Sequence, residues 1–355
     1  MPKAETQPLE LGIDTGLLLT EQHGKARHLH AILAALATRD DVQTTLLCSD
    51  EQLDTVAARY SHSSLSVDSY RSARRDAYDV VWYPWSTANF PTKSPTVLSI
   101  NELFAFTAPA KNFFTRRREQ HTLRNAARQA EALIAPSECL RDLSGELLDV
   151  DDAALSIIRP VPDPAWYPAL DPLPFSELAD MPYILVVPEP RGKQNLPLFF
   201  EAFARAYRKR DISVAICGTV PEKAQRSFRK IPHRHTVTAN ETELRALYRN
   251  AAAVAVPATH EAFHFTAIEA SACGAALITA NTPTLLEALG DTSLSIDAKE
   301  RDAWIEGLEL IIDDPALNAK LRAQAVNRWN ATARTAPLEQ LLSILRSCAG
   351  RDTYT

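Results

Sequence analysis

Residues 257–274 read PATHEAFHFTAIEASACG, and they follow the apolar run 251–256. The apolar run predicts a buried parallel strand, followed by a short loop and a helix that begins near Thr266. The amide groups at a helix start favour negative charge, so a turn of this kind can cradle a phosphate. Glu261 and Glu269 lie on either side of the turn, where their carboxylates can accept hydrogen bonds from sugar hydroxyls. The stretch therefore suits a nucleotide sugar.

Short apolar segments alternate with amphipathic segments along the rest of the chain. In the first half we expect strands at 9–13, 43–48, 80–83, 96–100 and 133–135, with helices at 27–37 and 138–147. In the second half we expect strands at 183–187, 212–217, 236–238, 253–256 and 276–279, with helices at 196–207, 241–250, 266–273 and 284–289. This alternation is typical of doubly wound parallel α/β sheets. It predicts two Rossmann-like domains that face a cleft, with ligands at the carboxyl ends of strands.

Proline interrupts the alternation between the two halves. Seven of the 24 residues at 159–182 are proline, which excludes a continuous helix or a central strand there. We therefore expect a linker in this stretch. The predicted N-terminal Rossmann-like domain is 1–165, and the predicted C-terminal one is 166–330.

Composition and charge narrow the class of protein. The chain has 355 residues and a net charge of -6, which argues against nucleic acid as a partner. No apolar run approaches the roughly 18 residues that span a bilayer, and residues 1–7 lack the apolar core of a signal peptide. Five scattered cysteines suit reduced thiols, so we expect a cytoplasmic protein. No side-chain cluster has metal-ligand spacing, and the Asp-x-Asp at 149–151 is interpreted as a solvated turn.

The stretch 257–274 resembles the signature of the retaining GT-B glycosyltransferases of the family 4-like group (group 1), which includes many bacterial polysaccharide and lipid glycosyltransferases. Their pattern is Glu-Gly-Phe-Gly-Leu-Pro-x-x-Glu-Ala-x-Ala-x-Gly. The matching residues are Glu261, Phe263, Glu269, Ala270, Ala272 and Gly274. Ala262 and His264 occupy the positions of the two loop glycines, and Phe265 and Thr266 replace the Leu-Pro pair.

The resemblance extends over nearly the whole chain and is closer in the C-terminal half. Residues 24–28 resemble the Gly-x-Gly-Arg-Tyr loop, 101–102 stand at the His-Asp position, 189–196 resemble Glu-Pro-Arg-Lys-Asn-Leu, and 327–333 resemble the C-terminal tryptophan segment. The resemblance implies a GT-B fold with the donor held mainly by the C-terminal domain and the acceptor by the N-terminal one. It also implies that a C-terminal helix within 331–355 crosses back to the N-terminal domain.

By resemblance, three residues would carry the catalysis. Glu261 would contact the transferred sugar near its reacting carbon. Arg191 and Lys193 would neutralise the departing diphosphate, because charge develops there as the glycosidic bond breaks. The alternatives are a solvated loop glutamate and a solvated basic loop.

Four residues of the signature are candidates for donor binding. Glu269 is implied to accept hydrogen bonds from both ribose hydroxyls; alternatively, residues 266–269 form a capping box in which Glu269 only closes the helix. The loop amides up to Phe265 and Thr266 are implied to face the donor sugar and its phosphates. His264 either contacts the pyrophosphate or turns to solvent, and a glycine replacement at positive φ would be uncommon.

Two further donor-binding candidates lie in the N-terminal half. Gly24 opens the first helix of that half and is implied to approach the phosphates on domain closure. Asn101 stands where the family has a histidine that contacts the donor sugar. It can hydrogen-bond a hydroxyl, but it cannot act as an acid or base near neutral pH. The alternative for Asn101 is an ordinary polar strand end.

Together these features predict a retaining, metal-independent hexosyltransferase, with no cofactor and with a role such as polysaccharide biosynthesis. It would move a sugar from a nucleotide-diphosphate sugar to a hydroxyl acceptor, whether polysaccharide, glycolipid or small molecule. The alternative is a glycosyltransferase-like partner or regulatory subunit with weak or no catalysis, because loop glycines and the cleft histidine are replaced. A GT-B epimerase or phosphorylase is a third interpretation, although no lysine segment would anchor pyridoxal phosphate.

Residues 111–128 hold six basic residues and one acidic residue, beside Phe113 and Phe114. Two interpretations of this segment stay open. It is either a helix in peripheral contact with an anionic membrane on its inner face, or a solvated helix face.

Overall fold

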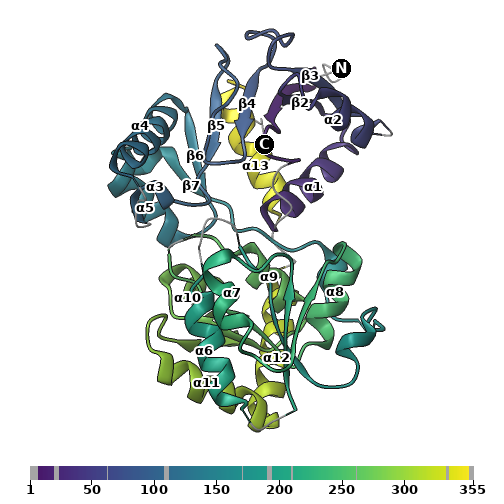
Figure 1. Ribbon diagram of the computed structural model, residues 1–355. Helices are drawn as coiled ribbons and strands as arrows, with labels where there is room; N and C mark the ends of the chain where they lie inside the picture. The colour runs from purple at the N-terminus through teal and green to yellow at the C-terminus, as the bar shows by residue number, and fades with distance from the viewer. Residues whose placement is uncertain are drawn as a thin grey trace. The chain divides into compact units, whose positions relative to one another are not determined.

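The computed structural model describes residues 7–19, 24–61, 63–107, 112–169, 171–189, 194–208, 211–260, 262–332 and 336–351. The chain forms two compact units, Met1–Pro160 with Ala336–Thr355 and Val161–Thr335 (Figure 1). Each unit is a parallel sheet flanked by helices, so the predicted fold class of two Rossmann-like α/β domains is confirmed. Within the described ranges, every helix is too short or too polar to traverse a lipid bilayer.

The N-terminal unit contains a seven-stranded sheet of order β3-β2-β1-β4-β5-β6-β7. Its strands are β1 (Leu9–Asp14), β2 (Val42–Cys48), β3 (Ser66–Ser69), β4 (Val80–Tyr83), β5 (Thr96–Ser99), β6 (Ala132–Ala135) and β7 (Leu155–Ile157). Its helices are α1 (Gly24–Leu36), α2 (Leu53–Tyr60), α3 (Phe104–Thr107), α4 (Phe113–Gln129), α5 (Glu138–Leu148) and α13 (Pro337–Cys348). The strand order reverses between β1 and β4, so the topological switch point of this sheet lies at their carboxyl ends.

One face of the N-terminal sheet is buried under α1 and α13. Leu33 of α1 and Leu342 of α13 belong to the same core cluster as Leu11 of β1, and all three side chains are fully buried. Burying a leucine side chain contributes about 1.5–3 kcal/mol. The last helix of the chain is therefore part of the N-terminal core, although the whole C-terminal unit precedes it in sequence.

The C-terminal unit contains a six-stranded sheet of order β10-β9-β8-β11-β12-β13. Its strands are β8 (Tyr183–Val186), β9 (Ser213–Cys217), β10 (Arg234–Val237), β11 (Ala253–Val256), β12 (Leu277–Ala280) and β13 (Ser293–Ile296). Its helices are α6 (Leu196–Ala206), α7 (Glu222–Phe228), α8 (Glu241–Asn250), α9 (Phe265–Ala272), α10 (Pro283–Leu289), α11 (Arg301–Asp313) and α12 (Pro315–Thr332). Here the order reverses between β8 and β11, and every residue of these two central strands is buried.

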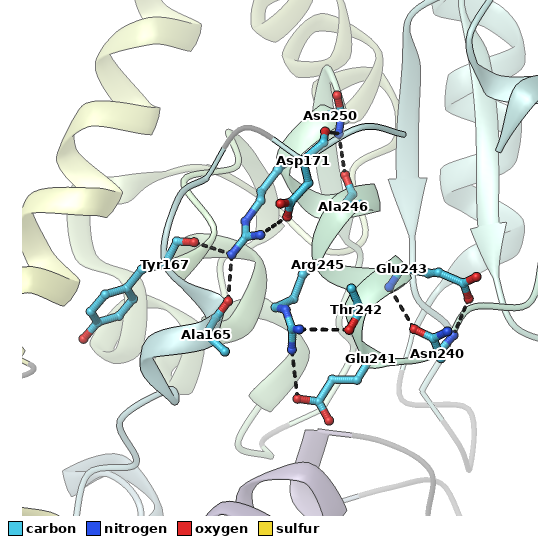
Figure 2. Close-up of polar contacts among 11 residues, drawn as sticks. Ala165, Tyr167, Asp171, Asn240, Glu241, Thr242, Glu243, Arg245, Ala246 and Asn250 are labelled. Carbon is cyan, nitrogen blue, oxygen red and sulfur yellow. Dashed lines mark hydrogen bonds and ion pairs between the residues drawn. The ribbon is translucent and has the colours of Figure 1, made fainter. Parts of the chain in front are cut away.

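The proline-rich stretch 161–182 packs onto the C-terminal unit. Trp166 is 3% exposed, and its ring lies against an aromatic side chain of α8. The guanidinium of Arg249, at the end of α8, pairs with the carboxylate of Asp171 and donates to the carbonyl oxygen of Tyr167 (Figure 2). The stretch expected as a linker is thus held by specific contacts.

Candidate functional site

Two loops meet at the carboxyl ends of β8 and β11. The backbone N–H of Asn195 donates to the carbonyl oxygen of Pro257 at 2.7 Å, and Gln194 forms a β-bridge with Ala258. The side chain of Gln194 also donates to the carbonyl oxygen of Val187. These contacts hold the two loops together at the topological switch point, where open α/β sheets bind their ligands.

A buried polar cluster of Glu189, His264 and Thr266, here called the Glu189 cluster, joins these loops. The two carboxylate oxygens of Glu189 lie 3.1 and 3.0 Å from Nδ1 of His264, and one accepts a 2.8 Å hydrogen bond from Oγ1 of Thr266. The side chains of His264 and Glu189 are 1% and 8% exposed. The cluster is therefore shielded from water, and its hydrogen bonds are charge-assisted.

The Glu189 cluster determines which nitrogen of His264 carries the proton. An ionised carboxylate only accepts hydrogen bonds, so Nδ1 of His264 is the donor toward Glu189. Nε2 is buried and has no hydrogen-bond partner among the described residues. The cluster thus presents one oriented, unsatisfied ring nitrogen.

The backbone at His264 needs no glycine. His264 has a φ of -91°, and Asp149 is the one non-glycine residue with positive φ among those described. His264 and Ala262 are therefore accommodated in the loop without left-handed backbone. The alternative that His264 turns to solvent is wrong, because its side chain is buried against Glu189.

Glu269 lies on α9, one turn after its start. This helix begins at Phe265, one residue earlier than expected, and its N-cap is His264. Thr266 is thus inside the helix, and its hydroxyl donates to Glu189. The capping-box alternative, which needs Thr266 at the N-cap, is therefore wrong. The Glu269 side chain is nearly buried, at 6% exposed.

Helix α12 fixes the position of α9. The indole Nε1 of Trp329 donates to Oγ of the buried Ser271 at 2.8 Å, and Arg322 donates to the carbonyl oxygen of Gly274 at 3.1 Å. Burial lowers the pKa of Arg322, although its guanidinium also donates to the carbonyl oxygens of Ala251 and Ala252. Burial also raises the pKa of the Cys273 thiol to about 12, which favours the protonated thiol at this position.

Only one of the other predicted site residues of the C-terminal unit, Phe265, lies within the described part of the chain. Glu261, Arg191 and Lys193, the three predicted catalytic residues, lie outside the described residues. Phe265 is 8% exposed, and its ring packs edge to face against Phe263 with 5.0 Å between centroids. The side chain of Phe265 is thus occupied in packing, and its backbone begins α9.

Gly24 and Asn101 lie in the N-terminal unit. Gly24 begins α1, and the next residue, Lys25, pairs with Glu102 at 2.9 Å, with both side chains largely buried. Asn101 follows β5 and donates from Nδ2 to the carbonyl oxygen of Pro84 at 2.8 Å. The start of α1 and the end of β5 are therefore joined, and the charge of Lys25 is balanced within the unit.

Sequence reasoning missed Asp14, a fully buried carboxylate at the end of β1. Asp14 accepts hydrogen bonds from the hydroxyl of Tyr70 and from the backbone N–H groups of Gly16 and Asn89. Burial raises the pKa of Asp14, and its hydrogen bond from Tyr70 opposes that rise. A Cβ at Gly16 would clash with the Tyr70 hydroxyl, so a larger residue there would displace that hydroxyl from Asp14. Asp14 thus shapes the loop at the switch point of the N-terminal sheet.

Sequence reasoning also assigned no role to Glu189, although this residue belongs to the segment that resembles Glu-Pro-Arg-Lys-Asn-Leu. The available signal was its position just after β8. Because the carboxyl ends of β8 and β11 are neighbours in the sheet, a carboxylate there can reach a histidine in the loop after β11.

Sequence comparison identifies relatives of the chain. Residues 175–328 match the family described as "Glycosyl transferases group 1". Glycogen synthase from Mycobacterium tuberculosis is 26% identical over 212 residues, which are 57% of this chain and 50% of that protein. D-inositol 3-phosphate glycosyltransferase from Rhodococcus opacus is 39% identical over 94 residues, 24% of this chain and 21% of that protein. The chain thus spans half the length, or less, of these curated relatives.

Two solved structures share the fold of the chain. HepE from Anabaena, in complex with UDP and glucose, aligns with a TM-score of 0.71 and 15% identity over 96% of this chain and 100% of that one. WaaG, a glycosyltransferase involved in lipopolysaccharide biosynthesis, aligns with a TM-score of 0.72 and 13% identity over 94% and 99%. Residues 175–328 therefore match the group 1 glycosyltransferase family, and the chain as a whole shares the GT-B fold of these two structures.

Proposed function

We propose that the chain transfers a sugar from a nucleotide-diphosphate sugar to a hydroxyl acceptor, with retention of configuration. The observation that carries this proposal is the Glu189 cluster, which lies at the carboxyl ends of β8 and β11 within the residues that match the family. HepE was solved with UDP-glucose bound, and the same class of donor is proposed here. The C-terminal unit would hold the donor and the N-terminal unit the acceptor, a polysaccharide, a glycolipid or a small molecule.

Glu269 is the proposed ribose ligand. Its carboxylate is acceptor-only, so its two oxygens can receive both ribose hydroxyls of a nucleotide. Thr266 is the second residue of α9, so Glu269 lies beyond the N3 position that a capping box requires. Because Glu269 does not close the helix in this way, the ribose role is favoured. Gly24 and Asn101 are proposed to approach the donor from the N-terminal unit.

His264 is proposed to bind a hydroxyl of the donor sugar through Nε2. With Nδ1 donating to Glu189 and the ring neutral, Nε2 would accept a hydrogen bond from a sugar hydroxyl. An unsatisfied buried polar atom costs about 1–3 kcal/mol, which such a hydrogen bond would recover. Glu189 would then act as a positioning residue.

The proposed reaction breaks the bond between the anomeric carbon and the diphosphate oxygen and forms a bond from that carbon to the acceptor oxygen on the same face. The acceptor proton passes to the leaving phosphate. Arg191, Lys193 and the amides at the start of α9 would stabilise the negative charge of the leaving group, and Glu261 would position the sugar.

Calorimetric titration with UDP, GDP, ADP and dTDP tests this function. We expect micromolar binding of one of them and a 10- to 100-fold weaker affinity in Glu269→Gln, about 1.4–2.8 kcal/mol, because hydrogen bonds to a charged group are lost. Glu306→Gln, an exposed change on α11, is the matched control and should bind as the wild type does. Unchanged affinity in Glu269→Gln would refute the ribose role. A folded wild-type protein that binds none of the four nucleotides would refute the transferase proposal and favour a noncatalytic partner subunit.

A further inference from the structure

The first turn of α4 exposes two large apolar side chains to solvent. Phe113 and Phe114 are 65% and 79% exposed, the highest values for large hydrophobic residues in the described part of the chain. Their rings pack edge to face with 5.8 Å between centroids. They therefore form one continuous apolar patch on a helix whose other buried contacts are already made by Leu123 and Ala127.

Exposed cations accompany this patch on the same side of α4. Arg117 and Arg118 follow Phe113 and Phe114 by four positions, so each arginine lies one helical turn from a phenylalanine. Both arginines are exposed, and their guanidinium groups make no ion pair or hydrogen bond among the described residues. Glu119 is the one acidic residue of α4, and it projects from the opposite side of the helix.

The remaining arginines of α4 are committed to the fold. Arg116 donates to carbonyl oxygens of α3, Arg124 donates to a carbonyl oxygen of α5, and Arg128 pairs with the carboxylate at the C-cap of α5. These contacts join α4 to α3 and α5. Arg117 and Arg118 differ from them, because their charges stay available to an external partner.

We propose that Phe113, Phe114, Arg117 and Arg118 form a docking surface for an anionic lipid bilayer. The phenyl rings enter the boundary between headgroups and acyl chains, and the guanidinium groups bind lipid phosphates. Charge complementarity selects this occupant. A second copy of the chain would place its own Arg117 and Arg118 against the same cations, and like charges repel. The chain as a whole has a net charge of -6, so its attraction to an anionic surface must come from a local basic site.

Co-sedimentation with lipid vesicles tests the proposal. We expect the full chain to bind phosphatidylcholine vesicles that contain phosphatidylglycerol, and to bind pure phosphatidylcholine vesicles at least about tenfold less. Phe113→Ser with Phe114→Ser, and separately Arg117→Gln with Arg118→Gln, should each lower the bound fraction by about tenfold, and added salt should weaken the wild type. These side chains are exposed, so circular dichroism should show that both variants keep the wild-type fold.

Matched controls lie elsewhere on the surface. Leu310→Ser removes an exposed apolar side chain of α11, and Arg226→Gln with Arg229→Gln removes two exposed charges at the end of α7; both should bind vesicles as the wild type does. The proposal is overturned if the wild type binds no anionic vesicles, or if the α4 variants bind as well as the controls. It is also overturned if sedimentation velocity shows a dimer that Phe113→Ser with Phe114→Ser dissociates, because the patch would then join two copies.

Discussion

Replacement of Glu189 tests whether the Glu189 cluster is a charged and fully paired unit. Glu189→Ala removes both acceptor oxygens and leaves two buried donors, Nδ1–H of His264 and Oγ1–H of Thr266, without a partner. Each unpaired donor costs about 1–3 kcal/mol, so the free energy of unfolding should fall by about 2–6 kcal/mol. This change belongs among the larger single-residue effects.

Glu189→Gln should be milder, because the amide can satisfy both neighbours. Its oxygen accepts from Thr266, and its nitrogen donates to Nδ1 of His264 once the ring proton moves to Nε2. Two charge-assisted hydrogen bonds become neutral ones of roughly half the strength, for a total cost of about 1–2 kcal/mol. The two variants should therefore differ in a defined order.

Urea unfolding at about pH 7 measures both free energies, and long-range nitrogen-15 NMR of the histidines reports the tautomer. Glu201 supplies the matched control, because this exposed carboxylate accepts one 3.3 Å hydrogen bond from Ser227. Its Ala and Gln variants should both change stability by less than about 0.5 kcal/mol. The reasoning is refuted if Glu189→Ala costs no more than Glu189→Gln, or if the proton of His264 resides on Nε2 in the wild type.

Two further predictions concern stability. Trp329→Phe should lower the free energy of unfolding by about 1–3 kcal/mol, because the buried Ser271 hydroxyl loses its indole donor. The double variant Trp329→Phe with Ser271→Ala should lower it by less than the sum of the two single changes, and strict additivity would contradict the pairing. Burial lowers the pKa of His28 and of His30 to about 4 in the folded chain. As the pH falls, these histidines are therefore protonated at a higher pH in the unfolded chain than in the folded one. The free energy of unfolding should therefore decrease between about pH 6.5 and pH 4. The decrease is at most about 3 kcal/mol for each histidine, and it is smaller the more that histidine is exposed. Chemical unfolding across this range should show a flatter profile when both are changed to Gln, and an equally steep one would contradict this cause.

The central strands were predictable because their sequences are apolar throughout. Parallel strands covered on both faces need no alternation, and β8 and β11 are buried at every position. Three strands were missed: β3, β7 and β13. Each is three or four residues long, and β13 is only partly buried along its length. A short strand at or near a sheet edge mixes polar and apolar residues, so its sequence resembles a loop.

The position of the candidate site was predictable, but its internal pairing was not. A strand followed by a loop and a helix places the stretch 257–274 at the carboxyl edge of the sheet. Glu189 and His264, however, are 75 residues apart in sequence, and their contact depends on the pairing of β8 with β11. The start of α9 was misplaced by one residue for the same reason, because Thr266 donates to Glu189 instead of capping the helix.

Replacement of the loop glycines does not in itself indicate lost function. If the loop had only lost its ligand-binding backbone, a histidine at position 264 would be expected to turn to solvent, whereas its ring is buried and oriented by Glu189. The proposed role of Nε2 adds a specific consequence. Glu189→Gln reverses Nε2 from acceptor to donor, so it should weaken binding of the nucleotide sugar while binding of the free nucleotide diphosphate stays near the wild-type value. Equal losses for both ligands would mean that the cluster supports the loop as a whole and does not contact the sugar.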